Sequence, residues 1–379
     1  MEKIKVVFID YKLVCGGAEQ ALFDLINLMD KEKFDITVFA QCPGGAWDRK
    51  FMDAGIRVIY DYSCRKPTFN PITKAGNVVK KLKTAQAYKN DGEGLLDVIL
   101  EEGADIVVSY SAWGYDQIAF ARNAKTVKYI HGDPGTDPVY RDEAIRKKEH
   151  LSRFDRIICV STSARDAFRE LSGLSDSVRL HYNPINSENV RRLAETEVEF
   201  PTDVPVICAV GRLSVDKTFE RLIIMHKNLL NEGIRHKVLI VGDGEDREYL
   251  ERLIRATDTE DTVILAGYQS NPYPYIKRSK FLVNCSYAEG MPVTAMEALT
   301  LGIPIVAPIP SIGELFGDQV CGIITENDNA SLQSAIRKML TDDAFYALAK
   351  AGAENRREFF DGKRMVKELE DMFLDLVKQ

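Results

Sequence analysis

The 379-residue sequence has no run of apolar residues long enough to cross a bilayer. Its first segment, MEKIKVVFID, reaches Asp10 after a short apolar stretch, so we expect neither a signal peptide nor a membrane anchor. Positive charge is also in deficit, with 50 lysines and arginines against 57 aspartates and glutamates, a net charge of -7. Because a nucleic-acid-binding domain needs a basic excess to neutralise phosphates, we expect no nucleic-acid partner.

Cysteine pairs and metal motifs are missing too. The seven cysteines are scattered without C-x-x-C spacing, which favours reduced thiols in a cytoplasmic protein. The sequence has no D-x-D for a bridging Mg²⁺ or Mn²⁺, and no H-E-x-x-H, Walker A, G-x-S-x-G or complete G-x-G-x-x-G motif. We therefore expect no metal site and no bound cofactor.

What the sequence does contain is the composition and periodicity of a folded α/β protein. Hydrophobic residues make up 45 % of the chain and charged residues 28 %. Short β-branched runs alternate with helical patterns, which predicts two doubly wound, Rossmann-like domains built on parallel sheets. The predicted strands are 3–9, 35–40, 57–62, 105–110, 126–131 and 156–161, then 204–211, 236–242, 262–267, 280–286 and 303–308.

The domain boundary is predicted in the acidic, weakly apolar stretch between Asn183 and Pro205. We assign residues 1–190 to an N-terminal domain and residues 191–359 to a C-terminal domain. The end of the chain has helical periodicity and no strand, so we expect residues 360–379 to form a helix that packs back on the N-terminal domain.

The segment 281–308 carries the most informative pattern, a buried strand followed by a loop, a helix and the next strand. Pro292 suits the first turn of the helix and Gly302 suits the residue after its end, which predicts a helix over 292–301. Free N–H groups and the positive end of the helix dipole would form an anion site where a diphosphate fits. The backbone of this site belongs to Gly290, Met291, Pro292 and Val293.

Two carboxylates lie in the same segment, with seven residues between them in the pattern E-x7-E. Glu297 on the helix can accept hydrogen bonds from ribose hydroxyls, whereas Glu289 in the loop faces whatever lies beyond the phosphate. Taken alone, the pair is better explained by a helix-capping acid and a solvated acid. The strand–loop–helix context favours a ligand site.

Two cations follow the predicted strand in CAVGRLSVDK. Arg212 offers a planar bidentate fork and Lys217 a mobile point charge, so together they could neutralise charge on a leaving nucleotide. Two solvated surface cations are the alternative explanation. In VGDGE, Gly242 could let a nucleobase or ribose approach the backbone. With no metal motif present, metal-free transfer to or from a diphosphate carrier is the most economical interpretation.

The N-terminal domain offers backbone and polar candidates at its predicted sheet edge. Gly16 and Gly17 lie between the first strand and the first helix, where the backbone could approach a phosphate or an acceptor. A plain tight turn would also explain this pair. Trp113, Tyr115 and Asp116 follow another predicted strand and could line an acceptor groove.

His131 ends the predicted strand 126–131 and enters the sequence HGDPG, which can continue neither a strand nor a helix. The imidazole is therefore expected at the carboxyl edge of the sheet, where open α/β sheets bind ligands. A structural histidine that bonds to the backbone is the alternative.

Together these segments resemble the GT-B glycosyltransferases of the large retaining family numbered four. The resemblance covers nearly the whole chain, and it rests on the order and spacing of several motifs. The matching segments are GGAE at 16–19, YIHGDPG at 129–135, ICVSTSARDAF at 158–168, NPIN at 183–186, VGRLSVDK at 210–217, VGDGE at 241–245 and EGMPVTAMEA at 289–298.

The resemblance implies two Rossmann-like domains that face each other across a cleft, and a role in polysaccharide biosynthesis. The implied reaction moves a hexose-type sugar, with retention, from a nucleotide diphosphate sugar to a glycan, lipid-linked or protein acceptor. UDP is preferred as the nucleotide, with GDP as the alternative. Neither a metal ion nor a protein nucleophile is implied, because the leaving phosphate helps to take the acceptor proton.

The resemblance also assigns roles to individual residues. Arg212 and Lys217 would hold the donor diphosphate and Glu297 the ribose. Glu289 would contact the transferred sugar, with His131 beside that sugar. Gly17, next to Gly16, would approach the diphosphate from the N-terminal side. The expected catalytic residues are Glu289, His131, Arg212 and Lys217.

Two departures from the family pattern stand out. Thr218 follows Lys217 where the family often has glycine. The usual acidic-glycine run after the last strands is replaced by PIPSIGELFGD, which leaves the contact between residues 309–318 and the nucleotide open.

Other functions on the same scaffold remain open at this point. One is a catalytically inactive glycosyltransferase-like partner subunit, although the donor set Arg212, Lys217, Glu289 and Glu297 is present together. Another is a sugar phosphorylase or a nucleotide-sugar epimerase. Transfer to inorganic phosphate, or epimerisation without an acceptor, would reveal these activities.

A basic stretch at residues 74–89 is unusual in an acidic chain. Its cations and its apolar residues are consistent with an amphipathic helix that contacts an anionic membrane surface from the cytoplasmic side. A solvated helix, or a basic loop that meets an acidic acceptor, is the alternative. The cations are Lys74, Lys80, Lys81, Lys83 and Lys89, and the apolar residues are Val78, Val79 and Leu82.

Overall fold

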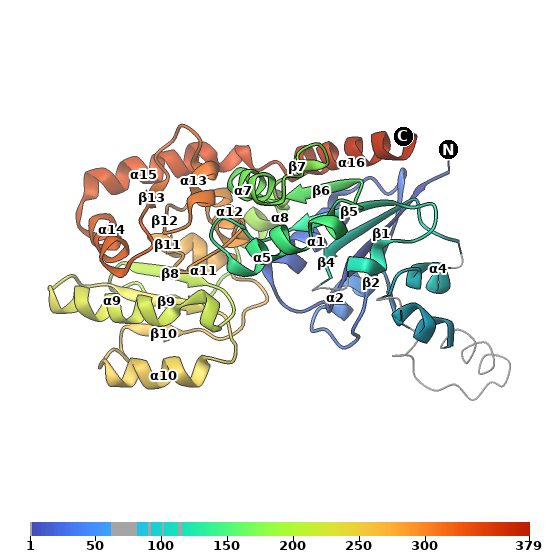
Figure 1. The fold of residues 1–379 in the computed structure, drawn as a ribbon. Coiled ribbons are helices and arrows are strands. Elements are labelled where there is room, and N and C mark those ends of the chain that lie inside the picture. The colour runs from blue at the N-terminus through green and yellow to red at the C-terminus, as the bar shows by residue number, and fades with distance from the viewer. Residues whose placement is uncertain (1, 62–81, 90–91, 101, 113–115) are drawn as a thin grey trace, which may run out of the picture. The chain divides into compact units, whose positions relative to one another are not determined.

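The computed structural model describes residues 2–61, 82–89, 92–100, 102–112 and 116–379. The chain divides into two compact units (Figure 1). One consists of Met1–Pro184 with Lys363–Gln379, and the other of Ile185–Gly362. Each unit contains one parallel sheet with helices on both faces, so the predicted doubly wound α/β architecture is confirmed.

The first unit has a seven-stranded sheet in the order β3-β2-β1-β4-β5-β6-β7. The strand order reverses between β1 and β4, the switch point at which open α/β sheets bind ligands. The strands are β1 (Ile4–Asp10), β2 (Phe34–Ala40), β3 (Arg57–Tyr60), β4 (Ile106–Ser111), β5 (Lys125–Ile130), β6 (Arg156–Cys159) and β7 (Val178–Leu180).

The helices of the first unit bury their apolar sides against this sheet. Leu95, Leu151 and Phe168 come from three different helices and pack with Val107 and Ile157 of the sheet in one core. Residues 82–88 are also helical. The remaining elements are α1 (Gly17–Leu28), α2 (Asp48–Asp53), α4 (Leu95–Ile99), η2 (Asp116–Ala119), α5 (Pro138–Arg146), α6 (Lys148–Leu151), α7 (Thr162–Ser172) and α16 (Gly362–Lys378).

The last helix, α16, packs on the first unit although its sequence follows the second. The ring of Phe373 lies 6.4 Å from the ring of Phe34 on β2, centroid to centroid, in an edge-to-face arrangement. The backbone N–H of Asp30 donates to Glu370 Oε1 over 2.6 Å. These contacts tie the end of the chain to segments more than 300 residues earlier.

The second unit has a six-stranded sheet in the order β10-β9-β8-β11-β12-β13, with its switch point between β8 and β11. The strands are β8 (Val206–Val210), β9 (Lys237–Val241), β10 (Val263–Leu265), β11 (Phe281–Val283), β12 (Ile305–Ala307) and β13 (Gly322–Ile324). The helices are α8 (Ser187–Leu193), η3 (Val215–Lys217), α9 (Phe219–Asn231), α10 (Arg247–Ala256), α11 (Tyr273–Arg278), α12 (Val293–Thr300), α13 (Pro310–Phe316), α14 (Asn329–Thr341), α15 (Asp343–Arg356) and η4 (Arg357–Phe359).

One core of the second unit lies between the sheet and the helices α9, α10 and α14. Leu222, Leu250 and Ile336 from these helices pack with Ile207 and Ile240 of the sheet. The helix α12 instead contacts α8 and α11. The sheet is therefore covered by two sets of helices, as a buried parallel sheet requires.

Two strands were not predicted from the sequence. Both β7 and β13 contain three residues and lie at the edge of their sheets, so their apolar pattern is too short to recognise. The segment 309–318, which departs from the family pattern, forms the helix α13 with Pro310 at its first position. The helix predicted over 292–301 is found as α12, one residue shorter at each end.

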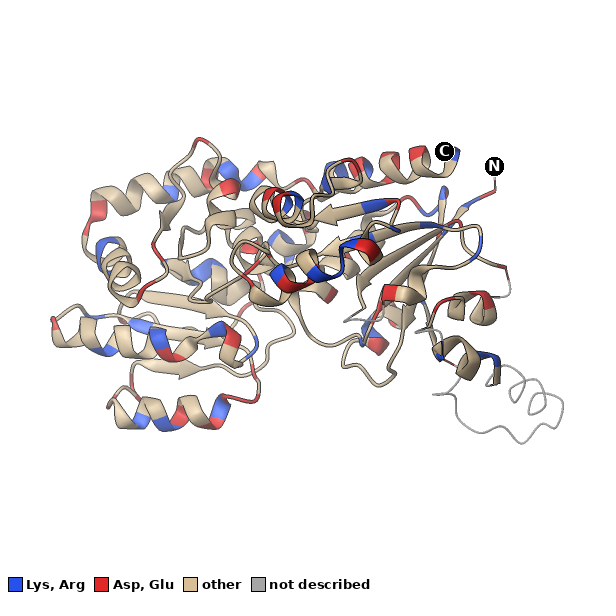
Figure 2. Cartoon of the chain, in the orientation of Figure 1, with Lys and Arg blue, Asp and Glu red and all other residues tan. Residues whose placement is uncertain are grey.

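Acidic and basic residues are interspersed along many of the helices, for example along α10 and α16 (Figure 2). Within the described part of the chain, no helix combines the length and the apolar character that a membrane-spanning segment needs. The described cysteines are all free thiols.

Candidate functional site

Lys217 and Glu289 come together at the switch point of the second sheet. Lys217 lies in the loop after β8, and Glu289 lies in the loop after the neighbouring strand β11. Lys217 Nζ forms an ion pair with Glu289 Oε1, and Ser286 Oγ donates to the same oxygen over 2.9 Å. The two charged side chains are only 27 % and 17 % exposed, so their attraction is screened less than that of a surface pair.

The helix α12 begins just after Glu289. Pro292 precedes its first residue in an extended conformation, and no side chain caps the first N–H groups. Gly302 follows its end with a φ of +69°, a left-handed conformation that favours glycine. Glu297, the second predicted carboxylate, is 5 % exposed on this buried helix. The start of α12 therefore offers a positive helix end beside a cation and a carboxylate.

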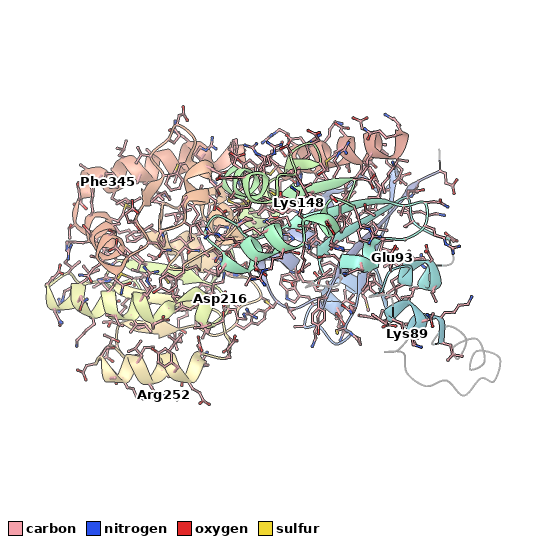
Figure 3. All side chains as sticks on the ribbon, in the orientation of Figure 1. Lys89, Glu93, Lys148, Asp216, Arg252 and Phe345 are labelled. Carbon is pink, nitrogen blue, oxygen red and sulfur yellow. The ribbon has the colours of Figure 1, made fainter. Side chains whose placement is uncertain are left out.

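Arg212 is held more loosely than Lys217. Its side chain is 58 % exposed, and its Nη2 lies 3.9 Å from Asp216 Oδ1. Figure 3 labels Asp216, whose Oδ2 is also 3.8 Å from Lys217 Nζ. Burial alone would raise the pKa of Asp216, but a hydrogen bond from Ser214 and the nearby cations bring it below its usual value. Asp216 is thus an anion beside both predicted diphosphate-binding residues.

The glycines of the turn after β9 are explained by contacts within the chain. Gly242 has a φ of +148°, and a Cβ at this position would collide with the carbonyl oxygen of Gly211. A Cβ at Gly244 would likewise collide with the carbonyl oxygen of Leu213. The backbone N–H of Leu213 donates to Asp243 O over 3.0 Å. Gly242 therefore lets two backbone segments pack together, whether or not a ligand also approaches it.

The start of α1 in the first unit has a comparable local explanation. Gly16 is the residue before the helix and Gly17 its first residue. A Cβ on Gly16 would collide with the carboxylate of Glu19, three residues later. A glutamate at this position normally turns back toward the helix start, as in a capping box. The Gly16–Glu19 contact thus accounts for the first glycine and the glutamate of the GGAE segment.

Asp10 is a buried acid that sequence reasoning did not select. It ends β1 at the switch point of the first sheet and is 1 % exposed. Burial, followed by the negative charge of Glu19, raises its pKa well above the usual value. A charged residue at the end of an apolar strand was the signal that could have found it.

His131 lies after β5, at the carboxyl edge predicted for it. Its ring is half-buried, 4.5 Å from the ring of Tyr110 and 5.6 Å from that of Tyr129, centroid to centroid. Burial and the charge of Lys128 lower its pKa to about 3, against a hydrogen bond to the Tyr110 backbone. Nε2 has no hydrogen-bond partner among the described residues. The imidazole is therefore neutral at physiological pH and can accept a hydrogen bond.

Asp116 does not line an open groove, contrary to our expectation. It is 1 % exposed, and its Oδ1 pairs with Lys128 Nζ over 2.7 Å and accepts from Ser109 Oγ over 2.5 Å. Burial would raise its pKa, but Lys128 and Ser109 hold it below the usual value. A buried lysine in the middle of β5 needs this partner, which the sequence pattern could not show. The other two predicted acceptor residues, Trp113 and Tyr115, lie outside the described residues.

Most of the basic stretch also lies outside the described residues, including Lys74, Lys80, Lys81, Val78 and Val79. Of the rest, Lys83 and Leu82 lie in the helical residues 82–88, and Leu82 is 67 % exposed. Lys89, labelled in Figure 3, follows this helix and is exposed.

Comparisons with known proteins identify the family. A model described as "Glycosyltransferase Family 4" matches residues 15–189, and "Glycosyl transferases group 1" matches residues 191–359. The chain is also 30 % identical, over 97 % of its own length and 98 % of the relative's, to a Campylobacter jejuni enzyme. That enzyme is named N-acetylgalactosamine-N,N'-diacetylbacillosaminyl-diphospho-undecaprenol 4-alpha-N-acetylgalactosaminyltransferase. The chain belongs to glycosyltransferase family 4. It is an enzyme of the transferase class.

Solved structures show that this family 4 member has the GT-B fold. Anabaena HepE, solved with UDP and glucose, is 19 % identical with a TM-score of 0.73, and the match covers 97 % of this chain and 99 % of HepE. Sucrose-phosphate synthase from Thermosynechococcus elongatus is 18 % identical with a TM-score of 0.75, covering 99 % of each chain. At these identities the likeness concerns the fold alone.

Proposed function

We propose that this family 4 enzyme transfers a hexose-type sugar from a UDP-sugar to a lipid-linked saccharide, with retention and without a metal ion. The observation that carries the proposal is the Lys217–Glu289 pair at the start of α12. A cation and a helix N-terminus are the groups that stabilise a diphosphate leaving group where no metal ion does so. The C. jejuni relative is named for a diphospho-undecaprenol acceptor, and HepE was solved with UDP, which supports the classes of acceptor and donor.

In the proposed reaction the bond between the sugar C1 and the β-phosphate oxygen of UDP breaks. A bond from C1 to the acceptor oxygen forms on the same face, and the acceptor proton passes to the leaving phosphate. Lys217 and Arg212 would hold the diphosphate as its negative charge develops. Glu297 would bind the ribose, and Glu289 would bind the hydroxyls of the transferred sugar.

Four further groups would contact the donor through hydrogen bonds that involve no charged side chain. His131 is neutral at physiological pH, so its contribution would be a hydrogen bond to the donor sugar and not a charge. Gly17 and the backbone at Gly290 and Val293 would donate N–H groups to the diphosphate.

A donor panel tests this proposal. Purified enzyme is incubated with UDP-N-acetylgalactosamine, UDP-N-acetylglucosamine, UDP-glucose, UDP-galactose and GDP-mannose, with and without an undecaprenyl-diphosphate-linked saccharide. Nucleotide release is measured, and NMR of the product gives the anomeric configuration. We expect release of UDP with retained configuration. Release from GDP-mannose alone, an inverted product, or transfer only to inorganic phosphate would contradict the proposal.

Metal independence is tested in the same assay. We expect the rate in excess EDTA to match the rate in Mg²⁺ or Mn²⁺, because side-chain cations and the start of α12 take the place of the ion. A rate that disappears in EDTA and returns with Mn²⁺ would overturn this part of the proposal.

A further inference from the structure

Thr218, directly after the proposed diphosphate ligand Lys217, has an unusual backbone conformation. Its φ is +50° and its ψ is 41°, the left-handed region. The other described non-glycine residues with positive φ are Asn123 and Asp258, whose short polar side chains tolerate it. A β-branched residue is a clear outlier there, and such outliers persist only where surrounding contacts hold them. This is the position at which the family often has glycine.

The side chain of Thr218 makes such a contact. It is 1 % exposed, and its Oγ1 donates a hydrogen bond to the carbonyl oxygen of Cys285. Arg221 Nη1, one turn further along α9, donates to the same oxygen over 3.0 Å. Two donors from the start of α9 therefore meet at one carbonyl in the loop after β11.

Arg221 is a buried cation whose hydrogen-bond acceptors are all neutral. It is 3 % exposed, with Nε 2.8 Å from Asn329 Oδ1 and Nη1 3.0 Å from Asn327 Oδ1. Its guanidinium lies 4.5 Å from the ring centre of Tyr287, and Asn327 Nδ2 donates to the Tyr287 carbonyl over 2.7 Å. A guanidinium is always charged, so its burial is unfavourable unless its donors are bonded. Nε and Nη1 of Arg221 are bonded in this way, whereas Nη2 has no hydrogen-bond partner among the described residues. Arg221 thus links α9 to two separate loops by several directed bonds.

The carbonyl that receives these bonds lies close to the proposed donor ligands in the chain. Cys285 precedes Ser286, whose hydroxyl holds Glu289. The Cys285 Sγ also lies 3.3 Å from the carbonyl oxygen of Lys217. The position of the Cys285 peptide therefore affects both Glu289 and Lys217.

We propose that Thr218 and Arg221 form a latch, the Thr218–Arg221 latch, that positions the Glu289 loop against Lys217 for sugar transfer. The inference rests on the proposed function for its catalytic consequence, but the latch itself is a property of the loop. Neither residue is proposed to touch the substrate. Both are positioning residues that act through Glu289 and Lys217, and the hydroxyl at position 218 supplies what a glycine could not.

The test compares two substitutions of the same residue. Thr218→Val keeps the branched shape and removes the hydroxyl, whereas Thr218→Ser keeps the hydroxyl. Thr257→Val is the matched control, because Thr257 Oγ1 also donates to a backbone carbonyl, that of Leu253 on α10. Hydrogen–deuterium exchange of residues 284–291 reports loop mobility, and turnover of the best UDP-sugar and the affinity for UDP report function.

For Thr218→Val we expect exchange in residues 284–291 to rise about fivefold and kcat to fall about fivefold, the equivalent of one lost hydrogen bond. The affinity for UDP should fall less than kcat does, because Glu297 on α12, the proposed ribose ligand, is outside the latch. Thr218→Ser should restore wild-type exchange and kcat, and Thr257→Val should change neither.

Two results would overturn the latch. One is wild-type exchange in Thr218→Val, and the other is an equal loss of kcat in Thr218→Val and Thr218→Ser. Wild-type protein that turns over none of the donors contradicts the proposed function alone. In that case the exchange comparison still decides whether the latch holds the loop.

Discussion

At the scale of the residue, the central observation is one ion pair with a neighbouring hydroxyl. Lys217, Glu289 and Ser286 come from two loops that are about 70 residues apart in sequence but adjacent at the switch point. Neither the Lys217 nor the Glu289 side chain is fully buried, so each can exchange its partner for a ligand. This arrangement suits a site in which a diphosphate replaces an internal partner.

We expect Lys217→Ala and Glu289→Ala each to lower kcat/KM by at least about tenfold, roughly 1.4 kcal/mol of transition-state stabilisation. Each substitution removes a group proposed to contact the donor. Steady-state kinetics with the best donor provides the measurement, and Lys227→Ala, on the outer part of α9, is a control that should retain activity. Wild-type kinetics in both site variants would mean that the donor binds elsewhere.

A second prediction concerns the buried pair Asp116–Lys128, which is 2.7 Å long. Asp116→Ala should lower the free energy of unfolding by about 3–5 kcal/mol, because it leaves the Lys128 ammonium buried without its partner. Urea unfolding followed by circular dichroism measures this change. The double variant Asp116→Ala with Lys128→Met should recover much of the loss. A loss below 1 kcal/mol in the single variant would show that Lys128 finds another partner.

Residue types and their local context predicted part of the site but not its pairings. Lys217 and Glu289 could be selected because each follows an apolar strand and the second precedes a helix start. Thr218 and Arg221 could not, because their importance comes from burial and from partners distant in sequence. Asp10 had a local signal, a charge at the end of an apolar strand, but its burial was not visible in the sequence. Asp116 was predicted to line an acceptor groove but is buried, because it pairs with Lys128 on the strand β5.

At the scale of the element, strands with clear apolar runs were predictable and brief edge strands were not. Runs such as KIKVVFI and HKVLIVG give strands within one residue of the expected bounds, β1 and β9. The three-residue strands β7 and β13 are completed by pairing with a neighbour, a long-range effect that no local pattern contains.

The basic stretch at 74–89 gives a prediction at this scale. We expect the protein to co-sediment with vesicles that contain anionic lipid, at low salt, because each lysine near the headgroups contributes about 1 kcal/mol. Binding should weaken at high salt and in a variant with Lys80→Glu, Lys81→Glu and Lys83→Glu. A matched triple variant elsewhere, Lys237→Glu, Lys277→Glu and Lys280→Glu, should sediment like wild type. If the wild-type protein does not co-sediment with anionic vesicles at low salt, the acceptor should be sought among free glycans and proteins.

At the scale of the whole molecule, the histidines set the response to acid. All five have a lowered pKa, in each case mainly because of burial. His226 and His236 also bond to each other, Nδ1 to Nε2, over 2.9 Å. The pKa of His226 falls to about 3, from burial and then the neighbouring His236.

A folded-state pKa below the unfolded value means that the unfolded chain binds the proton more readily. Stability from these groups is therefore complete above about pH 6.5 and is lost as the pH falls below it, by up to about 1.4 kcal/mol per unit for each histidine. For His131 and His226 the loss continues toward pH 3. Urea unfolding at pH 7.5, 6.0 and 5.0 measures the slope. His226→Gln should reduce that slope, and a stability that is flat from pH 7.5 to 5.0 would contradict the prediction.

The return of α16 to the first unit has a consequence for how the protein is made. Glu370 and Phe373 complete contacts with Asp30 and Phe34, an interval of 340 residues in the case of the Asp30–Glu370 hydrogen bond. During synthesis the N-terminal segment emerges first, and its partners on α16 leave the ribosome more than 300 residues later. The first unit can therefore fold fully only after the second has been translated, and a prematurely terminated chain would expose the side of β2 that α16 covers.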